Sequence, residues 1–172
     1  MVETHKHEFD QFMASMERPY HFVNSGLSNV YLIGVECRVC RICGKQAANI
    51  PAIEELMTVI ARVVVRKDAA LSGPEIRFLR KRLGIPSAEF GNIVGVTKEQ
   101  VSRWENGHNG PEKSADKLIR VFYCLISRDP TLEQQVNQHI EDWLTTIPGA
   151  DHISKYCAKL LDKEWTAESV LA

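Results

Sequence analysis

Apolar residues recur every three or four positions along much of the chain after residue 50, which is the spacing of one face of a helix. Segment 50–67 (IPAIEELMTVIARVVVRK) predicts one such helix, because Pro51 suits a helix start, and acids in the first turn and bases in the last suit the helix dipole. The predicted buried face of this helix is Ile53, Leu56, Met57, Ile60 and Val64.

Three later helices follow from the same periodicity, one after Pro111, one over about 131–147 and one from 151 to the end of the chain. The first is expected to bury Ala115, Leu118, Phe122 and Leu125, with Cys124 as a buried structural thiol. The other two are acidic and amphipathic, and we assign them to self-association or to a partner protein.

The N-terminal part has a different pattern. Between Tyr20 and Arg38, β-branched and aromatic residues alternate with polar ones on both sides of an Asn-Ser-Gly turn, which predicts a small antiparallel sheet. Residues 1–19 carry scattered Phe and Met among polar residues, and they predict a short amphipathic turn or helix that stops at Pro19.

Segment 71–107 (LSGPEIRFLRKRLGIPSAEFGNIVGVTKEQVSRWENG) has the start and stop signals of three short helices. Ser72 with Glu75, and Thr97 with Gln100, have the spacing of capping boxes. The remaining signals are Gly84 at one helix end, Pro86 at the next start, Gly95 in a tight turn, and Asn106 with Gly107 at the close. Two short helices around a glycine turn, the second rich in long polar side chains, indicate a helix-turn-helix.

This segment resembles the lambda-repressor-like helix-turn-helix family through Gly95, Thr97 and the run from Trp104 to Gly107. The resemblance implies that Lys98, Glu99, Gln100 and Arg103 face base edges, and that Ser87, Thr97 and Asn106 approach phosphates. It also implies an ion pair between Glu105 and Arg80. A charged helix face is more often simply solvated, but the combination of capping boxes, glycine turn and closing run favours DNA binding.

The net charge of the whole chain does not favour DNA binding, but the distribution of charge along the chain does. The net charge of the 172 residues is -1. Residues 62–120, however, contain 12 Lys and Arg against 7 Asp and Glu, while both flanking segments are acidic. The positive field that attracts phosphate is therefore predicted around the helix-turn-helix.

Three of the five cysteines lie at Cys37, Cys40 and Cys43, and the last two form a Cys-x-x-Cys-Gly knuckle. Two thiolates at this spacing can bind one zinc ion from a tight turn, but a structural zinc site needs four ligands and the chain has no second Cys-x-x-Cys pair. The knuckle therefore either takes its other ligands from elsewhere or binds nothing.

A second resemblance covers about residues 1–125. The order of a strand pair, the SGL-x-NVYL segment, Cys-x-x-Cys-Gly, a helix opening with Ile-Pro and a helix-turn-helix resembles the MqsA-like (YgiT-type) zinc-finger antitoxins and regulators. Members of that family carry a first Cys pair near the N-terminus, where this chain has His5-Lys6-His7. Zinc ligands of His5, His7, Cys40 and Cys43 are therefore expected, with Cys37 or His21 as substitutes.

We expect a mostly α protein: a lambda-repressor-like helix-turn-helix bundle with a small N-terminal β-rich, zinc-finger-like module and extra C-terminal helices. The predicted domains are the β-rich module 1–49, a connecting helix 50–70, the DNA-binding domain 71–127 and a helical extension 128–172 for dimerisation.

The predicted function is a dimeric, sequence-specific transcriptional regulator that represses a promoter. The alternative is the antitoxin of a toxin-antitoxin pair, which binds a toxin through its N-terminal module and autoregulates its operon. No motif supplies a general base at an open metal site, so no enzyme is expected. The sequence has neither an apolar run of about 20 residues nor a signal-peptide core, which predicts a cytoplasmic protein with no membrane partner.

Overall fold

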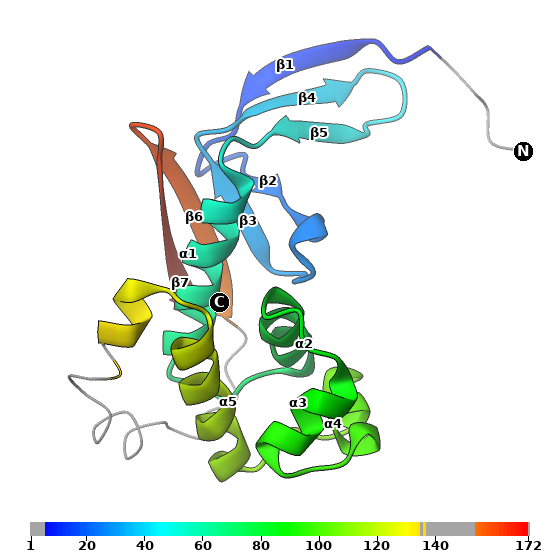
Figure 1. The fold of residues 1–172 in the computed structure, drawn as a ribbon. Helices are drawn as coiled ribbons and strands as arrows, with labels where there is room; N and C mark the ends of the chain where they lie inside the picture. Colours follow the sequence, from blue (N-terminus) through cyan, green and yellow to red (C-terminus); the bar gives the residue numbers. More distant parts are fainter. Residues whose placement is uncertain (1–5, 135, 137–153, 172) are drawn as a thin grey trace, which may run out of the picture.

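The computed structural model describes residues 6–134, 136 and 154–171. It is a mixed α/β protein in which one small sheet and a group of helices flank a central helix, while the other small sheet lies beyond the N-terminal end of that helix (Figure 1). The expectation of a mostly α protein therefore underestimates the β content.

The first sheet has the strand order β1-β4-β5, with every neighbouring pair antiparallel. The second has the order β2-β3-β6-β7, in which β6 runs parallel to β3 and the other pairs are antiparallel. The strands are β1 (Phe9–Met13), β2 (Tyr20–His21), β3 (Val30–Ile33), β4 (Glu36–Cys40), β5 (Gln46–Asn49), β6 (Ser154–Leu161) and β7 (Glu164–Leu171), with a 3-10 turn at Val23–Ser25.

The helices begin and end close to the positions that their capping signals indicate. They are α1 (Ile53–Arg66), α2 (Gly73–Arg82), α3 (Ser87–Val94), α4 (Lys98–Glu105) and α5 (Lys113–Ile126), and residues 130–134 are also helical. Ser72 caps α2 in a capping box with Glu75, and the Thr97 hydroxyl accepts a hydrogen bond from the Gln100 amide at the start of α4.

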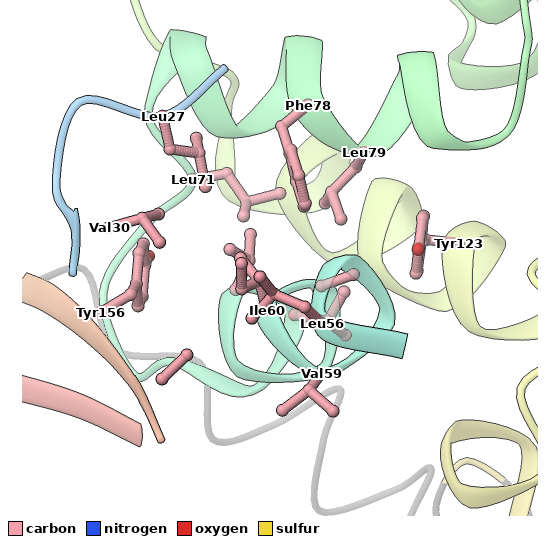
Figure 2. Packing of buried hydrophobic residues seen from close by; sticks show 14 of the residues in the cluster. Leu27, Val30, Leu56, Val59, Ile60, Leu71, Phe78, Leu79, Tyr123 and Tyr156 are labelled. Carbon is pink, nitrogen blue, oxygen red and sulfur yellow. The ribbon is translucent and has the colours of Figure 1, made fainter. Parts of the chain in front are cut away.

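The core lies around α1. Its apolar face packs between β6 and β7 on one side and the helices α2 and α5 on the other (Figure 2). Leu56, Ile60 and Val64 are completely buried there, as the periodicity of 50–67 predicts, whereas Ile53 is exposed. This central position makes α1 the connection between the sheets and the remaining helices.

Two predictions of secondary structure are wrong. Residues 9–13 form strand β1, not a helix, because β1 pairs along its whole length with β4. Residues 154–171 form the β6–β7 hairpin, because pairing of β6 with β3 and packing of the hairpin on α1 bury Tyr156, Ala158 and Trp165. Tyr156, Ala158 and Leu160 do alternate at period two in the sequence, a signal that the helical interpretation overlooked.

The buried face of α5 also differs from the predicted one. Leu118 and Leu125 are 42% and 53% exposed, and the buried side chains are Asp116, Ile119, Arg120, Tyr123 and Cys124. Burial raises the pKa of the Cys124 thiol to about 12, in keeping with a structural thiol. Of the helix expected over 131–147, most residues lie outside the described ones. Within the described ranges, no helix has the length and apolar character needed to cross a membrane.

Candidate functional site

His7, Cys40 and Cys43 come together at the far end of the first sheet. Their ligand atoms all lie within 4.8 Å of one another. The His7 Nδ1 atom is 3.3 Å from the Cys40 Sγ atom and 3.7 Å from the Cys43 Sγ atom. Imidazole nitrogen and two thiolates are ligands that suit zinc, so this cluster could hold a metal ion.

The turn after β4 brings the two sulfurs together. Gly44 adopts a positive φ of 69°, and its amide donates to the Cys40 carbonyl at 2.9 Å. The Cys40 amide in turn donates to the Lys45 carbonyl at 2.9 Å. Glycine permits this left-handed turn, which matches the knuckle expected from the sequence.

Strand β1 places His7 beside the two cysteines. Phe9 lies opposite Cys40 in the β1–β4 register, and the His7 ring stacks on the Phe9 ring with 5.6 Å between centroids. Arg41 fixes the same end of the strand, since its amide donates to the Glu8 carbonyl and its guanidinium pairs with Asp10. The hydrogen bond from Arg41 lowers the pKa of Asp10, so this pair stays charged.

The other proposed ligands are His5, Cys37 and His21. His5 lies outside the described residues, so the fourth position of a tetrahedral site has no ligand among the described ones. The structure does not bring Cys37 into the cluster: it lies three positions before Cys40 on β4, therefore on the opposite face, and burial raises the pKa of its thiol. The His21 Nε2 atom lies 2.7 Å from the Ser28 carbonyl oxygen on the other sheet.

The second candidate site is the pair α3 and α4, joined by a tight turn. Gly95 has a positive φ of 80°, and the Val96 amide donates to the Gly91 carbonyl at 2.8 Å. A Cβ atom at Gly91 would lie 2.7 Å from the Val96 carbonyl oxygen, so the two helices pack too closely there for a side chain. Gly73 is similarly restricted, because a Cβ would lie 2.1 Å from the Trp104 carbonyl oxygen.

The outer face of α4 carries the side chains expected to reach base edges. Lys98, Glu99 and Arg103 are exposed, and Gln100 is half-buried. The Glu99 carboxylate accepts hydrogen bonds from the backbone amide of Glu99 itself and from the Thr97 side chain. Both lower its pKa, so this group is anionic at neutral pH. An anionic Glu99 on this face suits a contact to the N4 amino group of cytosine better than one to phosphate.

The three residues expected to approach phosphates differ in their exposure and in their contacts within the protein. Thr97 is exposed beside α4, and Ser87 is half-buried at the first position of α3. Asn106 is exposed, but its amide nitrogen donates to the Ser102 carbonyl oxygen at 2.8 Å and its amide oxygen accepts from Arg77 at 2.9 Å. Asn106 therefore has a structural role at the end of α4 as well.

Glu105 forms the ion pair that the resemblance implies. Its carboxylate accepts from the Arg80 Nε atom at 2.6 Å and is itself buried. Arg77 also reaches it, with the Nε atom 3.3 Å away. The buried carboxylate thus links the last turn of α4 to two successive turns of α2.

Many of the basic residues counted in the sequence are engaged inside the protein. Among the described residues, ion pairs involve at least six of the twelve between 62 and 120, namely Arg62, Lys67, Arg77, Arg80, Arg82 and Arg120. Lys81, Lys98, Arg103 and Lys113 are exposed. The positive field available to phosphate is therefore weaker than the simple count of residues suggests.

Two surfaces with apolar side chains lie outside these sites. On the first sheet, a hollow of about 610 Å³ lies among β1, β4 and β5, and Met13 at its rim is 58% exposed. On α5, Leu118, Leu125 and Ile126 are between 42% and 53% exposed. Sequence reasoning missed the first surface because it expected a turn or helix at residues 9–13, and the second because it expected Leu118 and Leu125 in the core.

The chain matches one family of known proteins. The sequence model described as "Antitoxin component of bacterial toxin-antitoxin system, MqsA" matches residues 13–137. No curated protein matches the chain. The matched region includes Cys40, Cys43 and the segment α1–α5, while His7 and the β6–β7 hairpin lie outside it.

Proposed function

The chain belongs to the MqsA family of antitoxin components of bacterial toxin-antitoxin systems, and on this basis we propose that it is an antitoxin. In this proposal the N-terminal module binds the toxin, and the segment α2–α5 binds operator DNA and represses the operon. Membership of the family is the observation that carries the proposal. It implies a binding protein and not an enzyme, acting in the cytoplasm where the DNA is.

The first sheet supplies a surface for the toxin. Phe9 and Met13 on β1, and Met16 shortly after it, are 41%, 58% and 66% exposed, and such exposed large apolar groups favour a protein partner. The hollow beside Met13 also has Glu36 and Arg38 on its wall, which offer charged contacts of both signs. An apolar centre with a charged rim is the usual composition of a protein interface.

A zinc ion would stabilise this surface. His7, Cys40 and Cys43 would bind it, with His5 as the fourth ligand, and it would act as a structural crosslink between the N-terminal segment and the β4–β5 turn. Because β1 forms part of the toxin surface, loss of the ion is expected to weaken toxin binding before it affects α2–α5.

DNA binding is supported by the exposed face of α4. Lys98, Glu99, Gln100 and Arg103 would read base edges in the major groove, while Thr97 and Ser87 would approach the phosphates. The third proposed phosphate contact, Asn106, would have to share its amide with Arg77 and Ser102. We expect the affinity to be moderate, because Arg77, Arg80 and Arg82 of α2 form ion pairs within the chain. We also expect binding to be sensitive to salt, because contacts between the remaining basic residues and phosphates release counterions.

We assign dimerisation to α5. The described part of the C-terminal extension packs on α1 and β3, so the extension is a weaker candidate than expected from the sequence. Ala115, Leu118, Phe122 and Leu125 are spaced by three and four residues, and two of them are exposed. Such a face packs well against a second copy of itself, and a dimer would present two α4 helices to paired half-sites.

The antitoxin proposal is tested by co-expression. A small protein encoded beside this chain should arrest growth when expressed alone, and co-expression of this chain should restore growth. A variant with Met13→Asp and Met16→Asp should fail to restore growth, whereas Val23→Asp, an exposed apolar position on the 3-10 turn, should restore it. No arrest, or rescue by all variants equally, would contradict toxin binding by the first sheet.

A second candidate is a dedicated regulator with no toxin. The hairpin β6–β7 favours it, because this substantial element lies outside the segment matched by the antitoxin family. Selection of bound sequences from a random DNA pool at near-physiological salt addresses the DNA-binding part of both candidates. Recovery of a palindrome is expected, and recovery of nothing above background would leave only the protein-binding role.

A further inference from the structure

The β6–β7 hairpin contacts both ends of the connection between the N-terminal module and the DNA-binding helices. It joins the second sheet through parallel pairing of β6 with β3, where Val30 lies opposite Tyr156. Its inner face packs along α1 (Figure 1). Tyr156, Ala158 and Trp165 are almost completely buried there, so the hairpin is an integral part of the core.

At one end, the hairpin holds the turn that leads from the first sheet into α1. The Trp165 Nε1 atom donates to the Pro51 carbonyl oxygen at 3.0 Å. The next residue, Ala52, has a positive φ of 47°, a conformation that is unfavourable for a residue with a Cβ atom. The indole therefore fixes a strained turn that joins β5 of the first sheet to α1.

At the other end, the hairpin reaches the start of α2. The Tyr156 hydroxyl donates to Glu75, the residue that completes the capping box of α2. The same carboxylate accepts from the Lys67 Nζ atom at 2.7 Å and from the Ser72 amide at 2.7 Å. Burial raises the pKa of Tyr156, so its hydroxyl keeps the proton that it donates.

Figure 2 shows Tyr156 beside Val30 and near Ile60, between the strands and α1. Tyr156 and Trp165 lie on the same inner face of the hairpin, Trp165 near its tip and Tyr156 near its base. A rigid two-stranded element with one fixed residue at the start of α1 and another at the start of α2 can transmit a displacement between them.

We propose that the β6–β7 hairpin couples the N-terminal module, which carries His7, Cys40 and Cys43, to the DNA-binding helices, so that a change at the start of α1 alters the start of α2. This regulatory role rests on the proposed DNA-binding function. The hairpin would transmit toxin or metal binding at the first sheet to the start of α2, the helix against which α4 packs. The hairpin lies outside the matched family segment, which ends at residue 137.

Hydrogen–deuterium exchange of the full-length chain tests the coupling directly. Trp165→Phe keeps an aromatic ring but removes the donor to Pro51, and the readout is amide exchange at residues 75–79 of α2. Helix α4 in the same molecule reports global opening. Tyr31→Phe is the matched control, because Tyr31 lies on the outer face of the same sheet and stacks on His21.

Trp165→Phe is expected to accelerate exchange at 75–79 about three- to tenfold, the effect of losing one buried hydrogen bond, and to leave α4 unchanged. Tyr156→Phe should do the same, and Tyr31→Phe should change neither. Acceleration confined to β7 and the start of α1 would overturn the coupling. An equal acceleration throughout α2 and α4 would also overturn it, since the hairpin would then only stabilise the whole fold.

Operator binding by the wild-type chain, measured in parallel, separates the two proposals. If exchange at α2 responds but the wild-type chain binds no selected DNA, the coupling stands and the DNA-binding function fails. If the wild-type chain binds DNA and exchange at α2 does not respond, the function stands and the coupling fails. If both the coupling and the DNA-binding function hold, Trp165→Phe should weaken operator binding, although Trp165 is far in sequence from the base-reading face of α4.

Discussion

The Arg120 Nε atom lies 2.6 Å from the Asp116 Oδ1 atom, and both side chains are 2% to 3% exposed. This buried pair on α5 holds the connection between α1 and α2. Arg120 donates to the carbonyl oxygens of Val65, Lys67 and Ala69, and Asp116 accepts from the Leu71 amide. The polar backbone of the connection is thereby satisfied inside the protein.

Replacing Arg120 should therefore be severe. Arg120→Met leaves Asp116 as an unpaired buried charge and removes the donors to three carbonyl groups, so the free energy of unfolding should fall by about 3–5 kcal/mol. Urea denaturation measures this loss. Lys81→Met, at an exposed position of α2, should change it by less than about 0.5 kcal/mol. A loss below about 1 kcal/mol for Arg120→Met would show that the connection does not depend on this pair.

Zinc binding should depend on Cys43 and not on Cys37. Cys43→Ser removes one of the three clustered ligands at an exposed position, so the metal should be lost without unfolding of α1–α5. Cys37→Ser and Cys157→Ser should keep the metal, because neither residue belongs to the cluster. Metal analysis by mass spectrometry after dialysis, with circular dichroism for folding, checks this. Equal metal content in all four proteins would exclude the cluster as the site.

Arg103 should contribute to sequence recognition. Arg103→Ala removes an exposed guanidinium from the outer face of α4 and should cost about 1–3 kcal/mol on the selected operator, with relaxed specificity at one base pair. Fluorescence anisotropy with the operator and with scrambled DNA measures both effects. Lys45→Ala, which removes the same charge from the first sheet, should leave both affinities nearly unchanged. An equal loss on operator and scrambled DNA would make Arg103 a phosphate contact only.

Leu125 should be needed for dimerisation but not for folding. Leu125→Glu places a charge in the proposed α5 interface, where burial without a partner is unfavourable, so the dimer dissociation constant should rise at least about tenfold. Because Leu125 is already half exposed, the thermal stability of the monomer should hardly change. Analytical ultracentrifugation gives the result, with Thr166→Glu on β7 as a control of equal charge change. Unchanged association would move the interface away from α5.

Acid should weaken the contact between α1 and the segment after α5. Burial of Asp129 acts to raise its pKa, but the hydrogen bonds and charge of Arg62 outweigh this, and the pKa is lowered from 3.8. A lowered carboxyl pKa contributes stability that is present above the unfolded value and is lost as pH falls through the folded value. The stability of the wild-type protein should therefore fall as pH drops below about 4.

Asp129→Asn removes this titration. The difference in unfolding free energy between the wild type and Asp129→Asn should be largest above pH 4 and should shrink as the pH is lowered. Urea denaturation between pH 3 and pH 6 measures it, with Asp68→Asn at an exposed position as the control. A difference that stays constant with pH would mean that the ion pair with Arg62 does not lower the pKa of Asp129.

Local signals in the sequence were sufficient for the central part of the fold. The caps at Ser72 and Thr97 and the turn glycine Gly95 place α2, α3 and α4 almost to the residue, since each signal acts on neighbouring backbone groups. The Cys-x-x-Cys-Gly knuckle is local in the same sense. The resemblance to the MqsA-like family, confirmed by the match to residues 13–137, rests on these same segments.

Strand pairing between distant residues could not be predicted in the same way. Whether residues 154–161 form a helix or a strand depends on β3, more than a hundred residues earlier, because the pairing supplies the partners for both backbones. The same applies to β1 and β4, whose pairing brings His7 to Cys40 and leaves Cys37 on the other face.

The sequence by itself determined the helices α1–α4, the caps of α2 and α4 and the position of the Cys-x-x-Cys-Gly knuckle, because those depend on contacts within a few residues. Only the tertiary structure decided which face of α5 is buried. The apolar periodicity of α5 favoured burying Leu118 and Leu125, but Arg120 and Asp116 are buried instead, where the backbone of the α1–α2 connection supplies their hydrogen bonds. A buried charge is tolerated only when such partners exist, and their position is set by the whole fold.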